Sequence, residues 1–365
     1  MREHRTRLVF LLLLAALPVA AQVRSPEIHA DGRATLRLAS PNAEKVELLG
    51  DWRKPQQTIE LAKGDDGVWS VTIDPLEPGA YIYGFEVDGE AMPDPVNPAA
   101  KLRAAGVGSL LHIPGNPPAL WEARDVPHGE VRILFEKSPV LGGETRWMFV
   151  YTPPGYDQSS DKRYPTLYLL HGSNDTAAGW VMVGAANYIL DNLIADGKAE
   201  PMIVVMPFGH AVPYADREGR ARNTPLFERY LIDDVIPMIE SRFRTVPGRD
   251  ARALVGLSMG GGQSLTIGFN RLDLFSAIGA YSAAAPREFE KQFAEQLAEP
   301  DKLNERLKLL WFACGRDDRL FERSEKLSEL LTSKGVKHTF EATEGVHNYA
   351  AWRKYLASTA PLLFR

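Results

Sequence analysis

A serine hydroxyl framed by glycines lies in segment 256–260, G-L-S-M-G, directly after the apolar run 253–255. In a G-x-S-x-G turn that joins a strand to a helix, the serine backbone is strained, and small neighbours are needed to avoid clashes. Such a turn holds the hydroxyl at the carboxyl edge of a sheet. Residues 263–270, which follow, are typical of a helix. We therefore predict that Ser258 is a nucleophile and not part of a plain glycine-rich turn.

A serine nucleophile needs a general base and an acid that orients this base. In the expected chain order Ser, Asp, His, only His338 and His347 follow the serine and can supply the base. His338 lies in the alternating pattern of a strand, where a side chain is held rigidly, whereas His347 lies in a loop. We predict that His347 is the base. Asp317 and Asp318 both follow a buried strand pattern, so the residues alone leave the acid open between them.

The charge that develops on an acyl oxygen requires hydrogen-bond donors that are fixed in advance. The backbone amide of Met259 follows the nucleophile, and the loop after the first core strand offers the amide of Ser173 as a second donor. Trp180 lies further along this loop and His210 follows the next core strand, so both are candidates for substrate binding. His171 is interpreted as a structural residue of its loop.

The elements that must position these residues follow from the apolar patterns beyond residue 126. Strand patterns alternate there with helical patterns, which is typical of a mostly parallel sheet flanked by helices on both faces. The expected strands are 131–135, 147–151, 166–170, 202–206, 253–255, 277–279, 307–312 and 338–341. The expected helices are 187–196, 225–242, 263–270 and 324–334.

A second domain is expected before this one. Residues 24–117 contain short alternating strands between turn residues, which predicts a small immunoglobulin-like β-sandwich. The proline-rich stretch that follows predicts a linker, with the boundary near residue 120. Aromatic side chains in the sandwich could stack on sugar rings, but alternating aromatics more often fill such a core, and we favour the core. These aromatics are Trp52, Trp69, Tyr81 and Tyr83.

Both halves resemble known families. Segments 46–52, 67–69, 78–89 and 94–98 resemble the E-set modules of the family 48 carbohydrate-binding class. Segments 152–156 (T-P-P-G-Y), 164–172 (Y-P-T-L-Y-L-L-H-G) and 201–206 (P-M-I-V-V-M), with the serine turn, resemble the esterase D superfamily of α/β-hydrolases. Within it the chain is most similar to family-one carbohydrate esterases, the feruloyl and acetyl-xylan esterases.

The resemblance implies an α/β-hydrolase domain over residues 126–365 and a triad whose acid is Asp318. The family has a tryptophan two residues after the histidine, where this chain has Tyr349. Trp352 matches the family's second tryptophan and becomes a third candidate for substrate binding. No metal-ligand spacing or phosphate-binding loop is found, so we expect neither metal nor cofactor.

The first 21 residues predict a signal peptide. Arg2, Arg5 and Arg7 precede an apolar run that is too short to span a bilayer comfortably, and small residues precede Gln22. We therefore expect export to the periplasm or secretion. Cys314 is the only cysteine, so no intramolecular disulfide forms, and we interpret it as a buried apolar residue. The net charge is −5, and positive and negative residues are mixed along the chain, which indicates neither a nucleic-acid partner nor a polybasic membrane-binding patch.

These features predict an exported serine carboxylic-ester hydrolase that acts on ester-substituted plant polysaccharides or oligosaccharides. The expected partner is therefore an ester-substituted carbohydrate, and glycan contact by the N-terminal module is left open. One alternative is a siderophore esterase of the enterochelin type, because those enzymes also place a β-domain before this hydrolase fold. Another is a non-catalytic glycan-binding protein, against which the intact Ser258, Asp318 and His347 argue.

Overall fold

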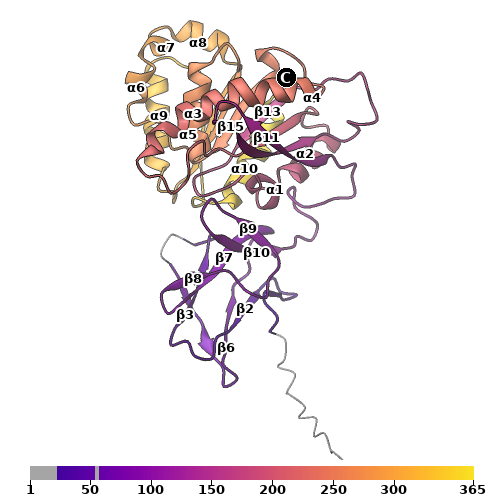
Figure 1. Cartoon of the computed structure of the whole chain (residues 1–365), viewed down its shortest axis with the longest axis vertical. Helices are drawn as coiled ribbons and strands as arrows, with labels where there is room; N and C mark the ends of the chain where they lie inside the picture. The colour runs from indigo at the N-terminus through magenta and orange to yellow at the C-terminus, as the bar shows by residue number, and fades with distance from the viewer. Residues whose placement is uncertain (1–22, 54–56) are drawn as a thin grey trace, which may run out of the picture.

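The computed structural model describes residues 23–53 and 57–365, which form a β-sandwich followed by a larger α/β domain (Figure 1). The predicted signal peptide, residues 1–21, lies outside the described residues. The sandwich ends with β10 (Val107–Ile113), and the large sheet begins with β11 (Glu130–Ser138).

The sandwich has two antiparallel sheets. In the smaller sheet the strand order is β1-β2-β6-β5, and in the larger it is β4-β3-β7-β10-β9, with β8 paired to β7. Trp69, Tyr81 and Tyr83 are buried between the sheets, as predicted, and half-buried Trp52 packs edge-on against Tyr81. The strands other than β10 are β1 (Glu27–Ile28), β2 (Ala34–Ala39), β3 (Val46–Gly50), β4 (Ile59–Glu60), β5 (Ala62–Lys63), β6 (Val68–Ile73), β7 (Gly79–Val87), β8 (Glu90–Met92) and β9 (Ala100–Leu102).

The large domain is built on an eight-stranded sheet with the order β11-β12-β14-β13-β15-β16-β17-β18. The first two strands are antiparallel to their neighbours, and all pairs from β14 to β18 are parallel. This is the mostly parallel sheet that the alternating patterns predict. The strands after β11 are β12 (Glu144–Thr152), β13 (Thr166–Leu170), β14 (Ile203–Pro207), β15 (Arg252–Leu257), β16 (Ala277–Tyr281), β17 (Leu309–Gly315) and β18 (Thr339–Thr343).

Helices cover both faces of this sheet because neighbouring strand residues point in opposite directions. Leu167 and Leu169 of β13 pack in one apolar cluster with α1 (Gly179–Met182), α2 (Ala186–Ala195) and α10 (Tyr349–Thr359). Tyr168 and Leu170 pack in a second cluster on the opposite face. Helices of that face are α3 (Asn223–Arg229), α4 (Ile236–Arg242), α5 (Met259–Asn270), α6 (Phe289–Gln292), α7 (Ala294–Ala298), α8 (Pro300–Arg306) and α9 (Phe321–Ser333).

The helix predicted over 225–242 is interrupted in the structure. A π-helical segment, η2 (Tyr230–Val235), separates α3 from α4. Pro237 lies in the first turn of α4, and it has no backbone N–H to continue the regular pattern of the preceding turn. The structure also contains helices that were not predicted, among them α10, which starts just after His347. Short 3₁₀ turns are η1 (Gly219–Arg222), η3 (Arg249–Ala251) and η4 (Ala360–Leu362).

The sandwich contacts the helical face that holds α1 and α10 (Figure 1). Arg353 of α10 is almost completely buried there, and its Nη1 donates to Ala80 O of β7 at 2.8 Å. Asn348 Nδ2 donates to Asp51 O, just after β3, at 2.9 Å. These contacts place the end of β3 and the start of α10 side by side. His347, the residue before Asn348, therefore lies next to the sandwich.

Candidate active site

The nucleophile turn has the geometry that its sequence predicts. Ser258 joins β15 to α5 with φ 52° and ψ −112°, a strained conformation for a residue with a side chain. A Cβ on Gly256 would overlap the backbone of Gly260, and one on Gly260 would overlap the carbonyl oxygens of Leu170 and His171. Both positions thus require glycine, because another segment of backbone passes too close to each of them for a side chain.

The structure brings the three predicted triad residues together. His347 Nε2 lies 2.9 Å from Ser258 Oγ, and His347 Nδ1 lies 2.8 Å from Asp318 Oδ2. Because an ionised carboxylate only accepts hydrogen bonds, Nδ1 carries the proton and Nε2 is free to accept from the serine hydroxyl. This is the tautomer that a general base requires.

Each member of this chain is supplied by a different strand end. Asp318 follows β17, and its side chain is completely buried, whereas His347 lies between β18 and α10. Burial raises the pKa of the Asp318 carboxyl, but hydrogen bonds from His347 and from the Leu320 amide outweigh it, so the net pKa is lowered. The carboxyl therefore stays ionised beside the imidazole.

The residues that competed for these positions lie elsewhere. Asp317 is exposed, and its backbone amide donates to Gly345 O at 3.2 Å. His338 lies just before β18, where its ring stacks on Phe312 and its Nε2 lies 2.9 Å from Ser328 Oγ. Of the two histidines His347 is therefore the one that contacts Ser258, and of the two aspartates Asp318 is the one whose side chain contacts His347.

A pocket of about 220 Å³ opens over Ser258. Gly172 and Ser173 line it, and a Cβ on Gly172 would lie 3.2 Å from Ser258 Cβ, so this loop runs directly beside the nucleophile. Met259 is the first residue of α5, immediately after the serine. The residues of the two predicted amide donors thus flank the nucleophile: Ser173 lies in the pocket wall, and Met259 begins the helix that follows Ser258.

The N-terminal sandwich supplies part of the same pocket. Asp51, Ile82, Lys101 and Arg103 line it together with the triad residues Ser258 and His347. None of these four residues could be predicted from the sequence, because no local pattern shows which edge of a sandwich will face a second domain. The module therefore forms one wall of the candidate active site.

A buried ion pair ties this wall to the hydrolase domain. The ammonium of Lys101 in β9 donates to Asp175 Oδ1, and both side chains are buried. Tyr349 Oη donates to Asp175 Oδ2 at 2.7 Å. Burial lowers the pKa of Lys101, and the carboxylate of Asp175 opposes that shift. Tyr349, which stands where the related family has tryptophan, thus gains a hydrogen bond that an indole could not make in the same way.

Two of the three predicted substrate-binding residues are buried and do not line the pocket over Ser258. Trp180 is completely buried, and its Nε1 donates to Leu170 O at 3.0 Å, so it belongs to the core below the site. His210 is also buried, packs against Phe208 and Tyr214, and is absent from the pocket wall. Burial lowers the pKa of His210 to about 4, so it is neutral at physiological pH.

Trp352, the third candidate, does line the pocket, but nearly all of its ring is buried. Its Nε1 donates to Ser282 Oγ at 3.0 Å, and its ring packs edge-on against His347 with centroids 4.9 Å apart. The observed contacts therefore hold the base in place. His171, interpreted as structural, accepts a hydrogen bond from the Gly209 amide at 2.8 Å through Nε2.

Within the described residues no group of three or more histidine, cysteine, aspartate or glutamate side chains could hold a metal ion. Nor is any helix within these residues long and apolar enough to cross a membrane. Cys314 is a buried free thiol near the end of β17, as interpreted.

Comparisons with known proteins agree with this architecture. The Esterase family model, described as "Putative esterase", matches residues 138–363, and the model of carbohydrate-binding module 48 (isoamylase N-terminal domain) matches residues 23–101. A curated relative from Xylanibacter ruminicola, named endo-1,4-beta-xylanase/feruloyl esterase, is 31% identical over 93% of this chain. The chain spans only 46% of the length of that relative.

Two solved structures illustrate the shared fold. The CE1 ferulic acid esterase of Anaeromyces mucronatus is 25% identical, with a TM-score of 0.58 over 67% of this chain and 93% of its own. The enterobactin esterase of Shigella flexneri is 17% identical, with a TM-score of 0.64 over 90% of this chain and 92% of its own. The matched residues, the sheet order and the serine turn agree on one conclusion: the chain belongs to the Esterase family and carries a carbohydrate-binding module 48 domain in front of it.

Proposed function

We propose that this chain is a serine carboxylic-ester hydrolase that removes feruloyl or acetyl esters from plant polysaccharides or their oligosaccharides. The observation that carries the proposal is the hydrogen-bonded series from Ser258 through His347 to Asp318. A serine hydroxyl becomes an effective nucleophile when an oriented imidazole accepts its proton.

In the proposed reaction Ser258 Oγ attacks the acyl carbon while His347 Nε2 accepts the hydroxyl proton. The Met259 and Ser173 amides donate to the acyl oxygen as it becomes negative. The imidazolium then gives the proton to the departing sugar oxygen, which leaves an acyl-enzyme. Water, deprotonated by the same imidazole, then attacks this ester, and the imidazolium returns the proton to Ser258 Oγ as the acid leaves. Asp318 keeps the imidazole in its tautomer and stabilises the imidazolium.

Three facts support a carbohydrate ester as substrate. The relative from Xylanibacter ruminicola is named for xylanase and feruloyl esterase activities, and the front domain matches a carbohydrate-binding module. In this chain the module also forms one wall of the pocket above Ser258. A substrate with sugar on the leaving-group side would contact that wall. Export completes the proposal, because the charged and apolar pattern of the first 21 residues fits a signal peptide and would bring the enzyme to extracellular glycan.

A siderophore esterase is the second candidate. The Shigella flexneri enterobactin esterase shares the arrangement of both domains, since it covers 90% of this chain. At 17% identity this likeness concerns the fold. The third reading, a glycan-binding protein without activity, leaves the ordered triad unexplained.

The test has two steps. The purified chain should hydrolyse 4-nitrophenyl acetate, and Ser258→Ala should lower the rate by at least about 10³-fold, because the nucleophile is lost. Ser333→Ala, an exposed serine at the end of α9, serves as the matched control and should keep full activity. Methyl ferulate, acetylated xylan and a catecholate trilactone are then compared. Preference for the trilactone would replace the carbohydrate proposal with the siderophore one, and no hydrolysis of any ester would refute both.

A further inference from the structure

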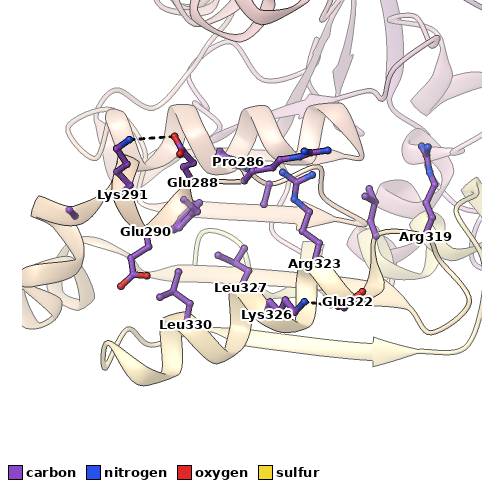
Figure 2. A pocket seen from close by; sticks show the side chains of 15 residues that line it. Pro286, Glu288, Glu290, Lys291, Arg319, Glu322, Arg323, Lys326, Leu327 and Leu330 are labelled. Atoms are coloured by element: carbon purple, nitrogen blue, oxygen red, sulfur yellow. Dashed lines mark hydrogen bonds and ion pairs between the residues drawn. The ribbon is translucent and has the colours of Figure 1, made fainter.

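A large groove lies beside the candidate active site, between α9 and the segment that follows β16. Its volume is about 1180 Å³, and Arg319 lines both this groove and the pocket over Ser258. Arg323 likewise lines both the groove and a neighbouring cavity that reaches Met259. The groove therefore borders the pocket over Ser258 at Arg319 and the cavity that reaches Met259 at Arg323. Figure 2 shows Arg323 pointing from α9 toward Pro286, with Arg319 further along the groove.

Among the residues that the structure describes, the glutamates that line the groove form ion pairs, whereas its arginines do not. Each glutamate of the wall has a lysine partner, in the pairs Glu288–Lys291, Glu322–Lys326 and Glu290–Lys334 at 3.8, 2.5 and 2.7 Å; Figure 2 draws the first two. The arginines differ. Within the described part of the chain, Arg287, Arg319 and Arg323 form no ion pair or side-chain hydrogen bond with a carboxylate.

Two of these arginines repel each other. Arg323 is half-buried, and its pKa is lowered first by burial and then by the charge of Arg287. Like charges that line one groove raise its free energy when no anion lies between them. A bound anion would relieve that repulsion. The floor beneath them contains apolar side chains, including buried Phe289 and Leu327, so the groove offers both a surface for packing and cations above it.

We propose that this groove binds the carboxylates of a uronate-bearing polysaccharide while an ester of the same chain lies at Ser258. Planar guanidinium groups bind carboxylates through two parallel hydrogen bonds, which suits them to this ligand. The volume exceeds that of a typical small-ligand pocket, so more than one sugar ring can be held. The proposal rests on the proposed function for the identity of the polymer, and it adds that acidic substitution of the polymer favours binding.

Binding is measured with Ser258→Ala, so that no ester is consumed and catalysis does not enter. The probes are acetylated glucuronoxylan oligosaccharides and the same preparation with its carboxylates converted to neutral methylamides. Titration calorimetry should give a Kd about tenfold lower for the charged form, as expected for one or two charge-assisted hydrogen bonds at a partly exposed site. When Arg287→Gln and Arg323→Gln are combined with Ser258→Ala, most of the difference in Kd between the charged and the amidated probe should disappear.

Arg229→Gln is the matched control, because Arg229 is an exposed arginine on α3 that lines neither the groove nor the pocket. It should leave the tenfold preference intact, and thermal melting checks that every variant is folded. Equal Kd values for the charged and amidated probes, or a preference that survives both groove substitutions, would overturn the proposal. Hydrolysis of 4-nitrophenyl acetate by the unmodified chain is assayed in parallel. Its failure would count against the proposed function and not against the groove.

Discussion

The Lys101–Asp175 pair offers a sharp test of how the two domains form one site. Lys101 belongs to the sandwich and Asp175 to the loop that follows the Ser173 donor, and both side chains are buried. Asp175 also accepts hydrogen bonds from Tyr349 Oη and from the Thr176 amide at 2.7 and 2.6 Å. Its carboxylate is therefore held by three donors, one of which comes from the other domain.

Lys101→Met keeps the apolar length of the side chain and removes the ammonium. Removing one partner of a buried pair typically costs about 3–5 kcal/mol, because the remaining charge stays buried without its counter-ion. The two other donors to Asp175 remain, so we expect about 3 kcal/mol, the lower end of this range. For a domain of this size, that loss lowers the thermal midpoint by roughly 6 °C or more. Lys101→Met with Asp175→Asn removes both charges and should recover a large part of the loss.

The assay is a double-mutant cycle by thermal and urea unfolding, together with esterase activity, because both residues line the pocket over Ser258. Lys45→Met is the matched control. Lys45 is also in the sandwich and paired, with Glu47, but that pair lies at the surface, so no measurable change is expected. If the double variant loses as much stability as the sum of the two single variants, the pair contributes no coupling and the reasoning is refuted.

Three further variants probe the site. Asp318→Asn should lower kcat by about 10⁴-fold, because an amide that donates to the imidazole favours the wrong tautomer; a drop of less than tenfold in ester hydrolysis would argue against the triad. Burial raises the pKa of the Asp51 carboxyl to about 7, so the folded chain binds the proton more tightly than the unfolded chain, and stability should fall as the pH rises from about 4 to about 8. Asp51→Asn should flatten that profile and raise the free energy of unfolding at pH 8 by about 2 kcal/mol. This is half of what the full pKa shift implies, because the side chain is partly exposed. A stability of the original chain that does not change with pH would contradict this expectation. Trp352→Phe loses the hydrogen bond to Ser282 and part of the contact with His347. It should therefore lower kcat by about three- to tenfold and leave KM unchanged. A raised KM with unchanged kcat would instead show that Trp352 contacts the substrate directly.

The parts of the site that local chemistry dictates could be predicted from the sequence. The turn at Ser258 needs glycines on both sides, and His347 lies in the expected loop after the last strand. The reason given against His338 is corrected by the structure: β18 begins at the residue after it, so His338 is not held in the strand, and it lies at the opposite end of β18 from His347. The residues alone left the acid open between Asp317 and Asp318. The resemblance to family-one carbohydrate esterases implied Asp318, and in the structure that side chain lies against the imidazole.

Side-chain direction and domain docking could not be predicted in the same way. The sequence places Trp180 and His210 near the correct edge of the sheet, yet both rings are buried: Trp180 lies in the core, and His210 packs against Phe208 and Tyr214. The sequence indicates where the backbone of such a loop lies, but tertiary packing determines whether a side chain points into the core or into the pocket. Lys101 gave no signal at all, because a lysine in a short edge strand is usually exposed, and only the hydrolase domain buries it.

The central claim is that Ser258 forms an acyl-enzyme with the help of His347. The most direct measurement is peptide mass spectrometry of the chain, quenched during turnover of 4-nitrophenyl acetate, beside Ser258→Ala treated in the same way. We predict one acetyl group on the peptide that contains Ser258, released with time, and no acetylation or turnover in the variant. Acetylation of a different side chain, or hydrolysis at the original rate by Ser258→Ala, would contradict the mechanism.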